Sequence, residues 1–331
     1  MPPVKTEPAI REGVVVGTMR AVVVEPGSPN RLGFREVETP SPAPSECLVR
    51  VAVISLNRGE VRRAQTSSEA GFRPGWDLAG TVERAAADGS GPPEGSRVVG
   101  MLESGAWAEL VAVPTVSLAV LPDGVSFAQA ATLPVAGLTA LYTLEQAGGG
   151  LLGKNVLITG ASGGVGLFAC RLARMSGARV VGVIRRPDCD ALVRETGAHE
   201  VVVGDGASGA GEHGPYDLIL DSLGGDALSS ALTMLATGGT CVSFGVTAGV
   251  EATFDVRRFY LTGGATLYGF IIFHEVLTRP AGAGLARLLR LVAEGSLEPR
   301  IELEASWGEI DDVAARLTDR DYAGKAVLHI A

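Results

Sequence analysis

Short apolar runs alternate with turn residues along the first third of the chain. Hydrophobic positions gather at 19–25, 34–38, 47–54, 78–84, 97–101 and 106–113. Gly, Pro, Ser and Asn fill the stretches between them. Many short strands with Gly/Pro turns are typical of a barrel or folded sheet. The N-terminal part is therefore predicted to form a compact, mostly β domain.

The pattern changes after Pro122. Ser126 is a good N-cap for a helix over 127–133, which Pro134 is expected to break before a second helix over 137–147. Apolar strands and helical runs then alternate, with strands expected at 155–159, 179–184, 200–203, 217–221, 239–244 and 266–273, and helices at 164–176, 188–196, 226–236 and 285–294. This alternation predicts a doubly wound parallel sheet, an α/β fold. Segments 301–304, 310–318 and 326–330 complete the chain in mixed order.

A glycine-rich turn stands between the first of these strands and the first of these helices. Strand Val156–Ile158 is followed by glycines at 160, 163, 164 and 166. Backbone N–H groups and the positive end of a helix dipole converge there, where a pyrophosphate can bind. We expect Ser162, Gly163, Gly164 and Val165 to contact it. Ala161 stands where a strict G-x-G-x-x-G has its first glycine, so a plain tight loop is the alternative.

The end of the second strand, over 179–184, bears on the choice of cofactor. An acidic residue there would bind a ribose 2′-OH and select NAD, whereas this strand runs into Arg185-Arg186. Two guanidiniums can pair with a 2′-phosphate, so NADPH is preferred over NADH; a solvated arginine pair is the alternative. Ser222, Phe244 and Gly245 follow later strands and are expected beside the nicotinamide half, unless they form ordinary turns.

Composition narrows the class. The 331 residues, 46% hydrophobic and 20% charged, allow two globular domains. A net charge of −9 argues against nucleic acid or a membrane surface as partner. Residues 1–18 have no signal-peptide pattern and are expected to be a flexible extension. The four cysteines have no C-x-x-C spacing, so we expect reduced thiols and a cytoplasmic protein. Lysine occurs only three times among 28 basic residues, which we take as a hint of a GC-rich bacterial genome.

Six short segments occur in a characteristic order: 55–57, 74–80, 130–134 with 137–140, 161–166, 221–225 and 324–328. With them the chain resembles the medium-chain dehydrogenase/reductase superfamily, in its zinc-free branch of quinone and enoyl reductases. The resemblance implies a GroES-like β domain over 19–126 and 266–331 and a Rossmann domain over 127–265. It also implies a cleft between them and a homodimer joined through the edge strand 267–273.

The resemblance implies site residues as well. Asn57 would donate its amide to the substrate oxygen or the nicotinamide ribose; the alternative is that it is only a turn residue. Thr139 would hold the nicotinamide carboxamide; the alternative is that its hydroxyl is hydrogen-bonded to the backbone of its own helix. Phe270 and Lys325 would complete the cofactor site. Zinc relatives carry ligands where this chain has Leu56/Asn57, Gly75-Trp76-Asp77 and Val135/Ala136, so no metal is expected. Arg62 stands where many relatives have Tyr, either as an anion clamp or as a solvated residue on a helix.

The reaction implied is hydride transfer from NADPH to a quinone or to the activated C=C bond of an enone or enoyl substrate. Two alternatives have the same fold. One is an enzyme without net redox chemistry, such as a cyclase of natural-product biosynthesis. The other is an NADPH-binding structural or sensor protein. The sequence does not identify the small-molecule substrate, its stereochemistry or the proton donor.

Overall fold

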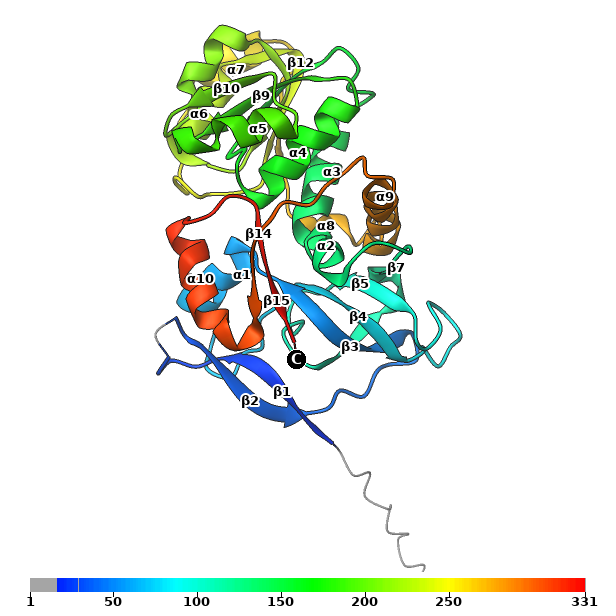
Figure 1. The fold of residues 1–331 in the computed structure, drawn as a ribbon. Helices are drawn as coiled ribbons and strands as arrows, with labels where there is room; N and C mark the ends of the chain where they lie inside the picture. The colour runs from blue at the N-terminus through cyan, green and yellow to red at the C-terminus, as the bar shows by residue number, and fades with distance from the viewer. Residues whose placement is uncertain (1–16, 29, 331) are drawn as a thin grey trace, which may run out of the picture.

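The structure, a computed structural model, describes residues 17–28 and 30–330, and Figure 1 shows it as two domains, one above the other. The predicted N-terminal extension, residues 1–18, lies outside the described residues except for its last two. Thr18 already belongs to the first strand, β1 (Thr18–Val24). Within the described residues, no helix combines the length and the apolar character needed to cross a membrane.

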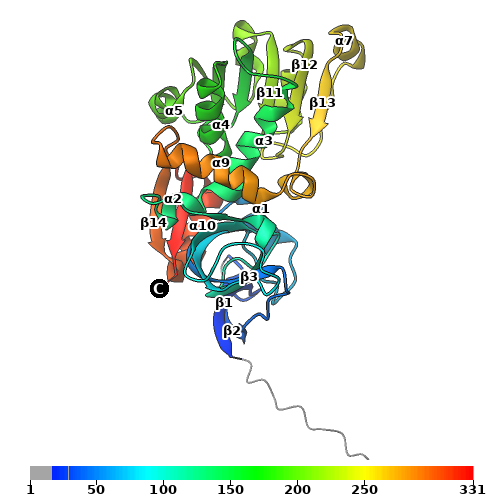
Figure 2. The ribbon, with the colours of Figure 1, turned by 90° about the vertical axis from the view of Figure 1, so that its right-hand side faces the viewer.

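The first domain is built on a seven-stranded, mostly antiparallel sheet. Along it lie β14, β15, β3, β4, β5 and β7, with β6 paired to β3, and β1 and β2 form a separate pair. The bounds are Leu32–Glu38 for β2, Glu46–Ser55 for β3, Asp77–Arg84 for β4, Arg97–Met101 for β5, Leu110–Pro114 for β6, Leu118–Val120 for β7, Ile301–Ser306 for β14 and Lys325–His329 for β15. Figure 2 shows this sheet curled on itself. The core of the domain includes the buried Trp107.

Two strands of this domain differ from the prediction. The run 106–113 forms a strand only from Leu110. Before it, Trp107 turns into the core and its carbonyl accepts a hydrogen bond from Val22 N (2.9 Å), so this part lies along β1. Strand β7 was not predicted. Helices α1 (Arg58–Thr66) and α10 (Ile310–Asp319) pack against each other beside the sheet.

The second domain is the predicted doubly wound parallel sheet. Its strands lie in the order β10-β9-β8-β11-β12-β13, so the direction of winding reverses between β8 and β11. The bounds are Asn155–Thr159 for β8, Arg179–Ile184 for β9, Glu200–Val203 for β10, Tyr216–Asp221 for β11, Leu235–Ser243 for β12 and Thr266–Gly269 for β13. Its helices are α4 (Gly164–Met175), α5 (Asp190–Thr196), α6 (Gly225–Leu232) and α7 (Val256–Leu261).

Strand residues in this sheet alternate between two cores. In β8, Val156 and Ile158 face one apolar cluster and Leu157 faces the other, and all three are fully buried. Such two-sided burial explains why the strand is apolar at every position. The parallel bridge between Gly163, which follows β8, and Gly324, which precedes β15, places the carboxyl end of β8 against the first domain. Because β9 and β11 are parallel to β8, their carboxyl ends lie at the same edge of the sheet.

The strand predicted over 266–273 is shorter, and the domain division predicted at 265/266 is wrong for it. Strand β13 pairs with β12 in the parallel sheet, with Leu267 beside Cys241, so it belongs to the Rossmann domain. Phe270 N still bonds Ser243 O (2.9 Å), but the chain then turns into the short helix α8 (Ile272–Glu275). The reason is burial, because the side chains of Phe270 and Ile272 both enter the core.

A helical segment joins the domains. Helix α2 (Phe127–Ala131) begins at the predicted N-cap Ser126, whose hydroxyl accepts from Gln129 N (3.1 Å). The predicted break at Pro134 does not occur, because Leu133–Gly137 forms a wide π-helical turn that continues into α3 (Leu138–Leu144). Pro134 lies at the start of this turn, where its missing N–H costs no hydrogen bond.

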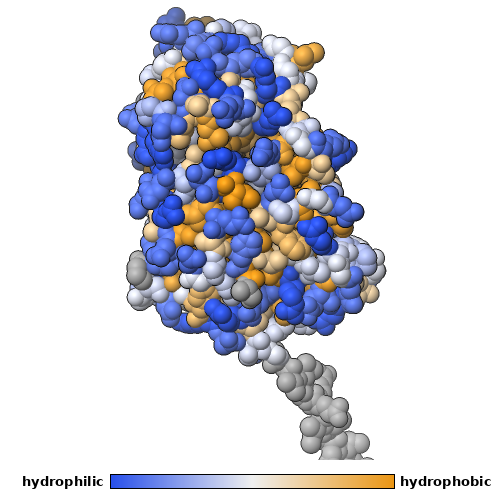
Figure 3. Space-filling view, viewed as in Figure 1, coloured by the Kyte–Doolittle hydropathy of each residue, from blue (hydrophilic) through white to orange (hydrophobic). Residues whose placement is uncertain are grey.

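This segment and helix α9 (Ala281–Ala293) share one continuous core with both sheets. The core runs from Val53 and Met101 of the first domain to Ile158 and Leu220 of the second. Apolar surface also shows on the face of Figure 3, around the level where the two domains meet. The two domains are therefore held together by apolar packing.

Candidate functional site

The turn between β8 and α4 has the shape predicted for an anion site. Gly160 has a φ of +63°, which favours glycine, and a Cβ on Gly166 would lie only 2.3 Å from Gly160 O. Gly163 is the exposed N-cap of the twelve-residue helix α4. The first N–H groups of such a helix have no partner within it. The turn therefore fits a diphosphate placed at the helix N-terminus.

The loop before β15 lies directly against this turn. Gly324 N donates to Ser162 O (3.0 Å), and Gly163 and Gly324 form an isolated parallel bridge. A Cβ on Gly164 would come within 2.8 Å of Lys325 Cδ, so the stem of Lys325 passes beside the helix start. The structure thus brings the predicted residues Ser162, Gly163, Gly164 and Lys325 together from two domains.

The two predicted arginines after β9 have different surroundings. The guanidinium of Arg186 binds the Asp188 carboxylate and donates from Nη1 to the carbonyls of Arg320 (3.2 Å) and Asp321 (3.1 Å). Arg185 is exposed and forms no ion pair or side-chain hydrogen bond with any other described residue. Arg185 is therefore free to meet an anion, whereas Arg186 holds the loop that follows α10.

Thr139 and the later strand ends surround the same edge. Only 5% of Thr139 is exposed, and within residues 17–28 and 30–330 its hydroxyl has no hydrogen-bond partner. The alternative of a hydroxyl satisfied by its own helix is therefore not what the structure shows. Ser222 Oγ donates to Thr159 O (3.0 Å), and a Cβ on Gly245 would lie 2.5 Å from Ser222 O. Phe244 is half-buried against the core, and the Phe270 side chain is buried.

A buried polar network contains Asn57 and Lys325 together with two carboxylates. Lys325 Nζ donates to Asn57 Oδ1 (2.6 Å) and Leu56 O (2.9 Å) and lies 3.5 Å from Asp77 Oδ2. Asn57 Nδ2 donates to Asp77 Oδ2 (2.8 Å) and to Glu60 Oε1 (2.9 Å). Because an ammonium only donates, Oδ1 of Asn57 must face Lys325, which fixes the orientation of the amide.

This network changes the predicted use of Asn57. Both amide hydrogens are already donated to carboxylates, so they have partners other than the substrate oxygen or ribose expected from sequence. The backbone N–H of Asn57 also donates to Glu60 Oε1 (2.7 Å). Asn57 is therefore held at the start of α1, and sequence analysis missed the two carboxylates that hold it. The available signal for Glu60 was its place three residues after an Asn N-cap.

Burial controls the titration of these groups. It raises the pKa of Asp77 above its usual value, against the opposing effect of Lys325 and of bonds from Asn57 and Val135. It raises the pKa of Glu60 well above the usual range, and the nearby Asp77 adds to this. It lowers the pKa of Lys325 despite both carboxylates. Glu60 Oε2 is buried and has no partner among the described residues, so Glu60 is the group of the network that most favours its neutral form.

Asp77 joins the three segments in which zinc relatives carry ligands. Its Oδ2 accepts from Asn57, and its Oδ1 accepts from Val135 N (3.0 Å). Trp76 packs edge-on against Phe273 of α8, with ring centroids 5.0 Å apart. The described part of the chain holds no cluster of three His, Cys, Asp or Glu side chains suited to a metal ion. All four cysteines are buried free thiols.

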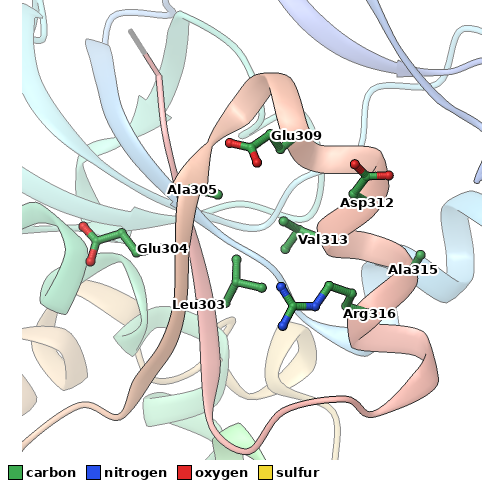
Figure 4. Close-up of a pocket in the computed structure, with 8 residues that line it drawn as sticks. All are labelled: Leu303, Glu304, Ala305, Glu309, Asp312, Val313, Ala315 and Arg316. Atoms are coloured by element: carbon green, nitrogen blue, oxygen red, sulfur yellow. The ribbon is translucent and has the colours of Figure 1, made fainter.

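Arg62 lies outside this network, exposed on α1 one turn after the half-buried Arg58. A surface hollow of about 560 Å³ also lies elsewhere, between β14 and α10 (Figure 4). Leu303, Val313 and Arg316 line it, and none of the predicted site residues does. The site is therefore the strand-end region around the glycine turn.

Two family models match the chain in the order of its domains. The alcohol dehydrogenase GroES-like domain covers residues 43–123, and the zinc-binding dehydrogenase model covers residues 164–286. The first lies within the curled sheet and its flanking segments, and the second covers most of the Rossmann sheet together with α8 and the start of α9. Neither match by itself establishes a metal, because the ligand positions hold other residues.

Curated and solved relatives agree with these matches. A quinone oxidoreductase of Pseudomonas aeruginosa is 33% identical to this chain, in an alignment that covers 91% of this chain and 96% of the length of that protein. A human quinone oxidoreductase is 32% identical over 70% of this chain and 75% of its own. A mycobacterial protein solved in complex with NADPH is 26% identical, with a TM-score of 0.84, over 94% of this chain and all of its own.

Proposed function

The chain belongs to the medium-chain dehydrogenase/reductase superfamily, in its quinone oxidoreductase-like branch, and is an NAD(P)-dependent oxidoreductase; we propose that it uses NADPH, without zinc, to reduce a quinone or the activated C=C bond of an enone or enoyl substrate. The observation that carries the proposal is the glycine turn at the start of α4, with the unpaired Arg185 at the end of the next strand. NADPH supplies the hydride when bound.

The residues around the turn divide between the parts of the cofactor. Ser162, Gly163, Gly164 and Val165 would hold the diphosphate, and Arg185 would hold the 2′-phosphate. The free hydroxyl of Thr139 would hold the nicotinamide carboxamide, near the strand ends at Ser222 and Gly245. The solved mycobacterial relative with NADPH supports a nicotinamide cofactor of this kind.

The chemistry of the residues at the ligand positions supports zinc-free catalysis. Where zinc relatives carry thiolate and imidazole, this chain has a carboxylate whose oxygens are occupied by Asn57, Val135 and Lys325. We propose that Asn57 and Lys325 act as positioning residues that keep the wall of the site rigid. The apolar pair Trp76–Phe273 lies beside this wall and suits a planar, weakly polar substrate.

The test is oxidation of NADPH, followed by its absorbance, with a panel of quinones, enones and enoyl thioesters. We expect turnover with at least one class, unchanged by a metal chelator. Thr139→Val, which keeps the shape and removes the hydroxyl, should weaken NADPH binding without unfolding the protein. Tight NADPH binding with no turnover on any class would favour the non-redox or sensor alternative. No binding of either nicotinamide cofactor would contradict the proposal.

We also propose a homodimer formed through the free edge of β13. Apolar side chains are exposed on β13 and on the segments that flank it in sequence: Leu267 on β13 is 40% exposed, Ile271 just after it 59%, and Tyr260 and Leu261 on α7 62% and 66%. An uncovered apolar strand edge favours pairing with another copy of itself. Sedimentation should show a dimer, and Leu267→Glu should shift it toward monomer. A monomeric wild-type protein at micromolar concentration would contradict this arrangement.

A further inference from the structure

One aromatic ring from each domain meets the other beside the buried polar network. Trp76 directly precedes Asp77, the first residue of β4, and Phe273 lies on α8. Their ring centroids are 5.0 Å apart, with the two ring planes inclined at 68°. We call Trp76 and Phe273 the aromatic pair. Both side chains are only half-buried, so part of each ring remains in contact with solvent.

The aromatic pair is joined to the elements proposed to hold the nicotinamide. The Asp77 carboxylate accepts a hydrogen bond from Val135 N (3.0 Å), in the π-helical turn that continues into α3 and Thr139. On the other side, Phe270 N donates to Ser243 O (2.9 Å) at the carboxyl end of β12, and α8 follows at once. A substrate that receives hydride from the nicotinamide would therefore lie beside the aromatic pair.

The ring on α8 has a rigid support. Glu275 of the same helix is buried, and its carboxylate accepts from Tyr268 OH (2.5 Å) and from Arg279 Nη2 (2.8 Å). Arg279 Nη1 also donates to Glu145 Oε2 (2.7 Å) at the C-terminal end of α3. These bonds fix α8 to β13 and to α3, so Phe273 is held in place by the Rossmann domain.

The position of the Trp76 indole depends on Gly59 in the first turn of α1. A Cβ on Gly59 would lie 2.7 Å from Cη2 and 3.0 Å from Cζ3 of the indole, well inside the usual separation of carbon atoms in contact. The backbone around the ring is fixed, because Leu102 N donates to Trp76 O (2.9 Å) and Asp77 belongs to the buried network. A side chain at position 59 must therefore displace the indole.

The helix itself does not need a glycine at this position. Gly59 is the second residue of α1 and has no positive φ, so its backbone conformation suits alanine. Alanine also stabilises a helix more than glycine does. What glycine provides here is room for the indole. The residue type at position 59 is therefore explained by the place that it gives to the Trp76 ring.

We propose that Gly59 is a specificity-determining residue: it places the Trp76 indole so that the aromatic pair bounds the substrate site and limits the width of the flat, conjugated ring that fits there. The inference rests on the proposed function and deepens it, because it assigns the limit on substrate size to one position of the first domain. Aromatic walls suit flat, weakly polar rings. An indole displaced from α1 moves toward Phe273 and narrows the site.

The test is oxidation of NADPH with quinones of increasing width: 1,4-benzoquinone, 1,4-naphthoquinone and 9,10-phenanthrenequinone. In Gly59→Ala, kcat/KM for the widest quinone should fall about tenfold relative to the narrowest, because small changes of volume in an apolar site carry effects of this size. Phe273→Ala widens the site, so the same ratio should move in the opposite direction. Gly150→Ala is the matched control, since a Cβ there would have nothing within 4 Å and should leave the ratio unchanged.

A double variant distinguishes a displaced indole from a general disturbance of α1. The phenyl ring of Trp76→Phe does not reach as far as Cη2 of the indole, so Gly59→Ala combined with Trp76→Phe should recover turnover of the wide quinones. The change should lie in KM more than in kcat. The affinity of Gly59→Ala for NADPH, measured by fluorescence titration, should equal that of the wild type.

The outcomes separate this inference from the proposed function. Turnover by the wild type with the same width preference in Gly59→Ala would overturn the inference alone. A loss that is equal for all quinones and persists with Trp76→Phe would show a structural role for Gly59 and overturn it too. Turnover of enoyl thioesters but of no quinone would also overturn only the inference. No turnover with any class of substrate would remove the proposed function as well.

Discussion

Two groups of charged side chains lie next to each other in this molecule and behave in opposite ways. The buried network of Asp77, Lys325, Asn57 and Glu60 places opposite charges together out of contact with water. Three arginines, Arg58, Arg185 and Arg320, which we call the arginine cluster, place like charges together where the two domains meet. Arg58 directly follows Asn57 of the network. In the network, the Lys325 ammonium has three oxygens around it, whereas in the cluster Arg58 has none among the described residues.

The difference separates charged side chains that stabilise the fold from charged side chains that are available to bind a ligand. A buried ion whose partners lie within the chain stabilises one arrangement of the segments, and losing one partner leaves the other uncompensated. A charge without a partner weakens the folded state slightly and is a place where an anion binds. Substitutions in the network should therefore change stability, and substitutions in the cluster should change affinity.

The largest effect is expected from Lys325→Met. It leaves the buried carboxylate of Asp77 without its cation, which should lower the free energy of unfolding by about 3–5 kcal/mol. Denaturant unfolding measures this loss. Lys154→Met is the matched control, because Lys154 has no ion pair within the described residues and should cost under about 0.5 kcal/mol. Equal losses of unfolding free energy in the two variants would show that the buried network contributes no more to stability than Lys154 does.

Arg185→Ala should change affinity and leave stability intact. We expect NADPH binding to weaken about tenfold or more, because a charge-assisted contact with the 2′-phosphate is lost, and NADH binding to stay nearly constant. Isothermal titration at two salt concentrations checks this, since added salt should weaken wild-type NADPH binding more than binding of the variant. A parallel loss of NADH affinity would show that Arg185 acts on the fold or on the shared half of the cofactor.

Glu60→Gln should change how stability depends on pH. The pKa of Glu60 is raised on folding above its usual value of 4.5, so the folded state holds a proton that the unfolded state has released. Stability is then lost as the pH rises from the unfolded toward the folded pKa. The neutral variant lacks this loss, so its stability should fall less steeply than that of the wild type as the pH rises above about 4.5. Parallel curves for variant and wild type would contradict a raised pKa.

Arg186→Ala should have the smallest effect on nucleotide selectivity. Its guanidinium is bound to Asp188 and to two carbonyls of the loop after α10, so it is not available to a phosphate. We expect NADPH to remain preferred, with at most a severalfold loss of affinity through movement of Arg320. A loss of selectivity equal to that of Arg185→Ala would restore the prediction from sequence that both arginines bind the 2′-phosphate.

Sequence alone predicted most of the Rossmann sheet, because buried strands followed by amphipathic helices leave a local pattern. It also located the glycine turn between β8 and α4. Helix α1 was expected only in one of the two interpretations of Arg62, as a helix that carries a solvated arginine. Its buried apolar residues are Val61 and Ala64 and its other positions are mostly polar, so its hydrophobic pattern is weak. Helix α7 is six residues long with no buried position, so it leaves no stripe to detect. Pro134 is misleading because proline rules assume an ordinary helix and not a π-helical turn.

The two charge clusters could not be predicted, because their members are far apart in sequence. Asp77 and Lys325 differ by 248 positions, and Arg58 and Arg320 belong to the first and last helices of the first domain. No local pattern shows which charges will meet, and a single sequence offers no second source of contacts. The role of Asn57 was missed for the same reason, since its partner Lys325 reaches it only through the fold.

Strand β15 lies between β14 and β3, where Val327 pairs with Ser55. During synthesis, the residues of β3 leave the ribosome long before their neighbour exists, so the curled sheet must wait with an open edge. The Rossmann domain, whose strands lie between Asn155 and Gly269, can complete itself in the meantime. The order of translation therefore allows the Rossmann sheet to pair completely before β15 is made, whereas the part of β3 that pairs with β15 stays without that partner until then.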